Sequence, residues 1–219
     1  MPRCWQRQMG GLLLSLVVAG MTLQASAQTP AAVAPTLAVA FPLTPVAVIA
    51  AFNTSLLEVM RLPASRTHAA TAELVQAALA RTFDTITLAR LALGRAASEF
   101  SPMQLYRYND LFRAHAIATY IARFNGFDGE SFVVDDARTL RRGRMLVHTR
   151  LLQTDSKHVR LDYLMHRTAH GWRVINVVAN GVSELSIRRA EFRALLTNSD
   201  AANLISKLEA QIARLMPPN

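Results

Sequence analysis

The chain has 219 residues and one cysteine, and its 24 Lys and Arg against 15 Asp and Glu give a formal net charge of +9 at pH 7. A single cysteine excludes a disulfide within the chain and a cysteine-rich metal site. The excess of positive charge favours anionic partners, such as acidic lipid head groups or an acidic protein. A solvated basic surface with no ligand explains the same charge.

The N-terminus is typical of a secretory signal peptide, predicted over residues 1–27. Arg3 and Arg7 form a basic start, residues 11–23 are mostly apolar, and Ala-Ser-Ala at 25–27 fits the small-residue cleavage pattern. The apolar run is short of the about 20 residues that a membrane-spanning helix needs, although an uncleaved anchor is an alternative. Cleavage would remove the only cysteine, and export makes nucleic acid a poor partner. We therefore expect no nucleic-acid binding.

The next segment, residues 28–45, is rich in Ala and Pro and carries no charge, so we expect a flexible leader. A single folded domain is predicted over 46–216, because no repeat or second domain is recognisable. Apolar residues recur at helical spacing over 46–61, 69–82 and 83–93, which predicts three helices.

A fourth helix is predicted to begin after Ser101. Pro102 suits the first turn of a helix, and Gln104 completes the spacing of a capping box with Ser101. One face of this helix is apolar and includes Leu105, Tyr108, Phe112, Ala116, Tyr120 and Phe124.

Beyond Glu130 the apolar period changes from helical to alternating, which predicts strands over 131–139, 144–153, 158–167 and 172–179. The short connections predict an antiparallel meander. The last strand is apolar on both faces, so we expect it to be covered on both sides. The fold class predicted is α+β: a four-stranded antiparallel sheet covered by N-terminal helices and two C-terminal helices, in one domain.

The residues that could carry chemistry also have simpler structural explanations. Ser183 follows a strand, but a nucleophile elbow needs glycine where Leu185 stands, so we interpret this serine as a helix cap. Asp162 and His148 are the only pair that we can propose for an enzyme, and an ion pair of Asp162 with Arg160 or Arg150 explains the aspartate equally.

The histidines lack the spacing that would direct two imidazoles at one metal ion, so no metal and no cofactor are predicted. Four arginines gather around the first hairpin, and Arg142 and Arg144 among them are candidates for contact with lipid head groups or a membrane. Solvation of the hairpin is the alternative.

In several places the order and spacing of residues resemble the periplasmic MlaC proteins, also called the toluene-tolerance auxiliary family. The resemblance extends from about Val46 to Leu215. It rests on Phe83-Asp84, Ala92-Leu93-Gly94, Ser101-Pro102-x-Gln104 with Phe112, Gly171-Trp172, Gly181-Val182-Ser183, Arg188-Arg189, Phe192 and the Leu204-Ile205 pair with Leu208.

This resemblance implies a non-enzymatic lipid carrier in the periplasm. Such a protein encloses acyl chains in an apolar cavity and exchanges its phospholipid with a membrane ABC transporter complex through transient membrane contact. The stretch from Gly181 to Glu191 is similar to the hopanoid-associated HpnM branch, which would make the cargo a hopanoid-type lipid. The expected cavity lining is Leu105, Phe112, Val147, Leu161, Tyr163, Trp172, Val174 and Val178.

The chain departs from the family pattern at three positions. Asn176 and Asn180 stand where the family often has acidic residues, and Phe100 stands where it tends to have Trp. Two other hypotheses stay open at this stage. One is an enzyme with a polar pocket around Asp162 and His148, and the other is a filled scaffold whose basic surface binds an acidic partner.

Overall fold

The structure is a computed structural model that describes residues 44–63, 65–154, 157–198 and 200–216. The predicted signal peptide (1–27) lies outside these residues, and so does the predicted leader (28–45) except for its last two positions. Those two begin the first helix, because the hydroxyl of Thr44 accepts the Ala47 N–H as an N-cap and Pro45 occupies the first turn.

The N-terminal half of the described chain is helical. It contains α1 (Pro45–Met60), α2 (His68–Thr82), α3 (Thr85–Leu93), the short 3₁₀ helix η1 (Gly94–Glu99) and α4 (Pro102–Arg123). The predicted capping box is confirmed, because Ser101 accepts the Gln104 N–H while the Gln104 side chain accepts the Ser101 N–H. Local signals therefore fix the start of the longest helix.

The strands that follow are β1 (Ser131–Leu140), β2 (Arg144–Leu152), β3 (His158–Thr168), β4 (Gly171–Ala179) and β5 (Val182–Ser183), with the turn η2 (Arg141–Gly143) between the first two. They form an antiparallel sheet in sequence order. The prediction of four strands was wrong, since the sheet has five. The turn at Asn180-Gly181 reverses the chain so tightly that Val182 and Ser183 pair with the end of β4.

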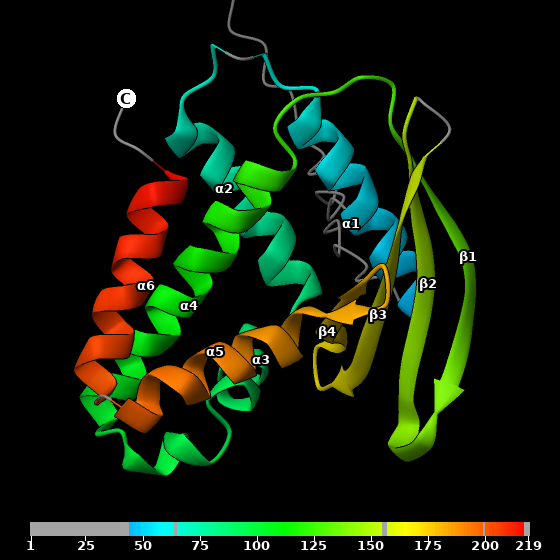
Figure 1. Ribbon diagram of the computed structural model, residues 1–219. Coiled ribbons are helices and arrows are strands. Elements are labelled where there is room, and N and C mark those ends of the chain that lie inside the picture. The colour runs from blue at the N-terminus through cyan, green and yellow to red at the C-terminus, as the bar shows by residue number, and fades with distance from the viewer. Residues whose placement is uncertain (1–43, 64, 155–156, 199, 217–219) are drawn as a thin grey trace, which may run out of the picture. The chain divides into compact units, whose positions relative to one another are not determined.

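Two helices complete the domain, α5 (Glu184–Asn198) and α6 (Ala201–Leu215). Figure 1 shows α1 alongside the sheet, and α2, α4 and α6 packed together away from the first hairpin. α5 leaves the sheet at β5 and passes α3 toward α6. The predicted α+β class, with helices at both ends of the chain, is confirmed.

The apolar interior divides into two clusters. The first lies between α1, α2 and the sheet and includes Phe52 and Tyr163. The second lies among α3, α4, α5 and α6 and includes Tyr108 and Phe192. Only α4 contributes buried residues to both clusters, with Tyr108 and Leu111 in the second and Ile117 and Ile121 in the first. α4 therefore joins the two parts of the interior.

Two irregularities in strand pairing decide which side chains face the first cluster. One lies at Asp135 in β1, between Val134 and Asp136, and the other lies in β4, where Met165 pairs with Val174 but Leu164 pairs with Asn176. Each inserts an extra residue and so shifts the alternation of side chains between the two faces.

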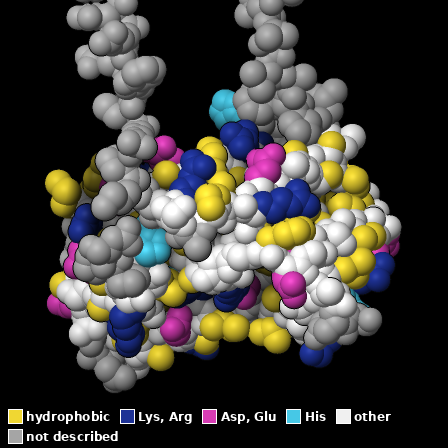
Figure 2. All heavy atoms as spheres, turned by 90° about the horizontal axis from the view of Figure 1, so that it is seen from above, with side chains coloured by type: hydrophobic (Ala, Val, Ile, Leu, Met, Phe, Trp, Pro, Cys, Tyr) yellow, Lys and Arg dark blue, Asp and Glu magenta, His cyan; other side chains and the backbone are white. Residues whose placement is uncertain are grey.

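Charged side chains are interspersed with apolar ones on the face seen from above in Figure 2. Lys and Arg lie beside Asp and Glu there, so the positive charge of the chain is not gathered into one field on this face. None of the helices in the part of the chain that the structure describes is long and apolar enough to cross a membrane.

We expect Phe52→Ala to lower the free energy of unfolding by about 3–5 kcal/mol, the usual cost of emptying a buried aromatic site. Phe52 is 2% exposed, and its ring lies 5.2 Å from Phe83 and 6.3 Å from Tyr163, centre to centre. Ile86→Ala is the control, since Ile86 is 70% exposed and should change stability by less than about 0.5 kcal/mol. Urea denaturation measures both, and equal losses would contradict the assignment of the core.

Candidate functional site

A pocket of about 130 Å³ lies where the two apolar clusters meet. Its wall comes from α2, α3, α4, β4 and α5. Most of the lining is apolar, namely Leu79, Phe83, Leu88, Phe112, Ala116, Tyr120, Val177 and Leu185. The first cluster supplies Leu79 and Phe83, whereas Phe112 and Leu185 pack against the second.

Charged side chains border the same pocket. Arg123 at the end of α4 donates to Glu184 at the start of α5, with 2.9 Å between Nη1 and Oε1. Arg188, one turn further along α5, donates to Glu191 at 3.2 Å and lies 3.4 Å from Nδ1 of His115. The ion pair between Arg123 and Glu184 is half exposed and therefore weak. The pocket thus combines an apolar wall with two guanidinium groups.

His115 is buried in the wall of this pocket. Burial, together with the positive charges of Arg188 and Arg123, lowers its pKa to about 4. The imidazole is therefore neutral at pH 7, and Arg188 donates to its Nδ1, which leaves the proton on Nε2. Protonation of His115 would bring a third positive charge between two guanidinium groups.

The segment Phe83-Asp84 links the wall of the pocket to β4 by backbone pairing. Phe83 pairs with Val174, and the Asp84 N–H donates to the Val174 carbonyl at 3.0 Å. The Asp84 carboxylate caps α3 through Thr87 and contacts Nε2 of His166 at 2.9 Å. Burial alone would raise the pKa of Asp84, but the hydrogen bonds from Thr87 and His166 outweigh it and lower this pKa.

The turn from β4 into α5 brings Glu184, Leu185 and Arg188 to the pocket. Ser183 caps α5, as predicted, because its hydroxyl accepts the Ser186 N–H at 3.1 Å. The Asn176 carbonyl oxygen accepts from both the Ser183 hydroxyl and the Leu185 N–H. The uncharged amide of Asn176 thus holds the turn that leads into α5.

Comparison with known proteins agrees with this arrangement. The MlaC protein family matches residues 51–210, which is most of the chain. The chain belongs to the MlaC family.

The fold is also similar to the solved structure of a phospholipid-binding protein from Ralstonia solanacearum in complex with a phospholipid. The two chains are 19% identical, with a TM-score of 0.69, and the match covers 77% of this chain and 97% of that one. No curated protein matches the chain.

Seven of the eight residues predicted to line a cavity in this MlaC family member fall into two groups. Val147, Leu161, Tyr163 and Val174 are buried in the first apolar cluster, and Trp172 packs against it. Leu105 and Phe112 pack against the second cluster. Of the predicted set, Phe112 lies in the wall of the pocket between the clusters.

Val178 is placed differently from Val174. The extra residue in β4 shifts the alternation, so Val177 and Ala179 face the first cluster while Val178 pairs with Asp162 on the other face of the sheet. Strict alternation from Val174 to Val178 was therefore the wrong assumption, and Val177 takes the place in the pocket wall.

Sequence reasoning missed the charged residues of the pocket. His115 and Arg123 both belong to α4, whereas Arg188 lies far along the sequence in α5 and meets them only when the two helices pack together. One signal was present in the sequence. Several residues of α4 that line the pocket follow one another at helical spacing, namely Phe112, Ala116, Thr119, Tyr120 and Arg123.

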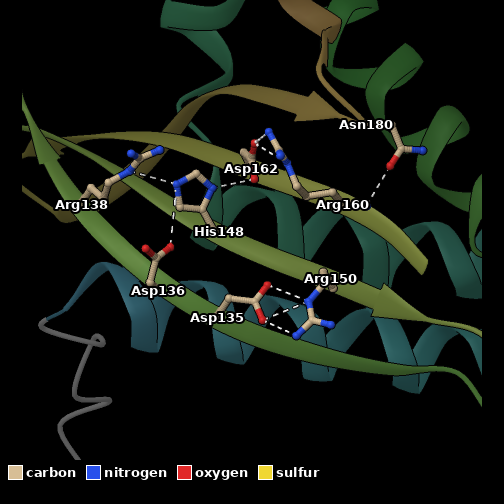
Figure 3. A network of polar contacts seen from close by, with 8 residues as sticks. All are labelled: Asp135, Asp136, Arg138, His148, Arg150, Arg160, Asp162 and Asn180. Carbon is tan, nitrogen blue, oxygen red and sulfur yellow. Dashed lines mark hydrogen bonds and ion pairs between the residues drawn. The ribbon is translucent and has the colours of Figure 1, made fainter. Parts of the chain in front are cut away.

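Asp162 and His148 do come together, but on the other face of the sheet (Figure 3). Nδ1 of His148 lies 2.8 Å from the carboxylate of Asp162, whose side chain is 5% exposed and also binds the Arg160 guanidinium at 2.8 Å. Arg138 donates to Nε2 of His148 at 3.2 Å. Both nitrogens of the imidazole are thus occupied by structural partners.

Of the two arginines expected to pair with Asp162, Arg160 does so and Arg150 does not. Arg150 pairs with Asp135 instead, at 2.6 Å, because the irregularity in β1 brings Asp135 and Asp136 to the same face of the sheet (Figure 3). Neither Asp162 nor His148 lines the pocket. No three His, Cys, Asp or Glu side chains of the described residues gather as they would around a metal ion.

Arg142 and Arg144 lie at the hairpin between β1 and β2. Arg142 is exposed and has a left-handed backbone with φ of 61°, as does Gly143 with φ of 63°. Arg144 begins β2 opposite Leu140 and is half-buried. Neither side chain lines the pocket, and contact of these two arginines with lipid head groups or a membrane stays a prediction.

The pKa of His115 predicts a loss of stability in acid. The folded protein binds the proton at about pH 4 and the unfolded chain at about 6.5, so the unfolded state takes up more protons between these values. Wild-type stability should fall, relative to His115→Gln, by on the order of 2 kcal/mol as the pH drops through this window. Urea denaturation at several pH values measures the difference, and parallel pH profiles for the two proteins would contradict it.

Proposed function

We propose that this MlaC family member is a lipid carrier of the periplasm and not an enzyme. The observation that carries the proposal is the apolar pocket at the junction of the two clusters, with arginines beside it. The related fold from Ralstonia solanacearum binds a phospholipid, which supports the same ligand class here. Each Å² of apolar ligand surface removed from water stabilises the complex by about 25 cal/mol.

The pocket must widen to hold acyl chains. Its volume of about 130 Å³ is below the roughly 300–1,000 Å³ that ligand pockets usually have. Because it lies between two separately packed clusters, small movements of α5 and α3 away from α4 and β4 would enlarge it while each cluster stays intact. The half-exposed ion pair of Arg123 with Glu184 would resist such a movement only weakly.

The guanidinium groups of Arg123 and Arg188 are suited to a lipid phosphate beside the pocket. Guanidinium groups bind phosphate oxygens in pairs of parallel hydrogen bonds. In the lipid-free protein both groups are satisfied by Glu184 and Glu191, so a phosphate would replace a carboxylate partner and leave no buried charge unpaired.

An enzyme built on Asp162 and His148 is the less supported alternative. Such an enzyme needs both groups in a pocket that a substrate can reach. They lie instead on the opposite face of the sheet from the apolar pocket and are occupied by Arg160 and Arg138.

The protein purified from a bacterial periplasm should contain bound lipid, measured by extraction and mass spectrometry. Ala116→Trp should reduce the lipid content several-fold, because the indole fills the pocket. Ala210→Trp on the exposed face of α6 is the matched control and should keep the wild-type content. A wild-type protein free of lipid, or equal lipid content in the two variants, would overturn the carrier proposal.

The same extraction identifies the cargo. A glycerophospholipid is the cargo that we expect, and a polycyclic triterpenoid would instead support the relationship to the hopanoid-associated branch. The resemblance to the MlaC family also supports a membrane ABC transporter complex as the partner. Lipid-loaded and lipid-free protein should then differ in their binding to vesicles that contain such a complex, and equal binding would contradict this partner.

A further inference from the structure

A second, larger concavity lies beside the pocket and is lined by a different set of charges. It has a volume of about 690 Å³ and lies between η1 and α5. Arg188 lines the pocket, while its neighbour Arg189 lines this groove together with Arg193 and Arg95. Two adjacent residues of α5 thus line two separate concavities. We call the second one the arginine groove.

The arginine groove concentrates positive charge that has no acidic partner. Among the residues that the structure describes, Arg107, Arg113, Arg123, Arg150, Arg160 and Arg188 each form an ion pair with a carboxylate. No carboxylate of the described residues lies within ion-pair distance of Arg95, Arg189 or Arg193. Glu99 is the one acidic residue in the groove lining.

Repulsion between the arginines of the groove destabilises the folded state slightly. Arg189 and Arg193 are four residues apart on α5, and like charges at this spacing repel by a few tenths of a kcal/mol. Arg95 adds a third charge from the opposite wall. An anion bound between the walls would remove the repulsion.

Gly94 makes room for one of these guanidinium groups. A Cβ at this position would lie 3.4 Å from both Nε and Nη2 of Arg189, and the backbone has φ of 60°, which favours glycine. The side chain of Arg189 therefore rests against a bare stretch of backbone at the start of η1. A side chain at position 94 would crowd this guanidinium.

We infer that the arginine groove is a binding site for a phosphate group, separate from the lipid pocket. A phosphate offers more acceptor oxygens and more charge than one carboxylate, so several guanidinium forks can share it. The volume exceeds that of a free phosphate and leaves room for an attached organic part, which favours the head group of a membrane lipid over inorganic phosphate.

The test compares two variants that carry the same net charge. Arg189→Gln/Arg193→Gln removes two charges from the groove, and Arg81→Gln/Arg167→Gln removes two exposed charges from α2 and β3. Binding is measured at low salt by co-sedimentation with vesicles of phosphatidylcholine and phosphatidylglycerol in equal amounts. Affinity should fall by about tenfold or more in the groove variant and much less in the control. Equal affinities would overturn the inference.

A lysine variant separates recognition of phosphate from attraction by charge alone. Arg189→Lys/Arg193→Lys keeps both charges but loses the planar fork that binds two oxygens. We expect its affinity for the vesicles to lie several-fold below that of the wild type. Wild-type affinity in this variant would overturn the inference, because general attraction would then explain the binding.

Two further titrations identify the source of the phosphate and exclude a protein partner. One outcome is that inorganic phosphate binds in isothermal titration, that this binding requires the groove arginines, and that vesicles do not bind. This outcome would support a phosphate site filled by free phosphate. If polyglutamate is the only ligand that binds, and its binding requires these arginines, the inference is overturned in favour of an acidic protein. The lipid content of each purified variant is measured in parallel. Loss of vesicle binding with unchanged lipid content separates the groove from the carrier proposal.

Discussion

The division of the apolar interior into two clusters joined by α4 is the constraint on which the other features depend. A helix of 22 residues is long enough to bury one end among α3, α5 and α6 and the other against α1, α2 and the sheet. Where the clusters meet, the packing is incomplete, and Phe112 and Ala116 border a pocket there. A single core with the same residues would have no such boundary, because protein interiors pack densely.

The sheet separates this pocket from the polar network around His148 and Asp162. Its inner face supplies aromatic and aliphatic side chains, whereas the outer face carries the network around His148 and Asp162. Burying a carboxylate is costly unless polar partners surround it, and Asp162 has such partners in Arg160 and His148. This network is best understood as stabilising the outer face of the sheet.

The arginines beside the pocket and those in the groove have different surroundings. Around the pocket, Arg123 and Arg188 are held by glutamates that a phosphate could replace. In the arginine groove, three arginines line the walls and Glu99 is the one acidic residue beside them. The same residue type therefore supports two proposals, one for the cargo and one for a second phosphate. The side chains of Arg188 and Arg189 point into different concavities because consecutive residues of a helix diverge by about a quarter turn.

The sequence by itself determined the helices, the antiparallel strands and the helix caps, because these depend on contacts between near neighbours. The Ser101 capping box and the Ser183 cap could be predicted from spacing alone. Only the tertiary structure decided which faces line the pocket, since an extra residue in β4 exchanges Val178 for Val177 without any local signal. It also decided where the charges gather. Arg188 meets His115 and Arg123 only because α5 packs against α4, and the distance in the sequence between the two helices hides that meeting.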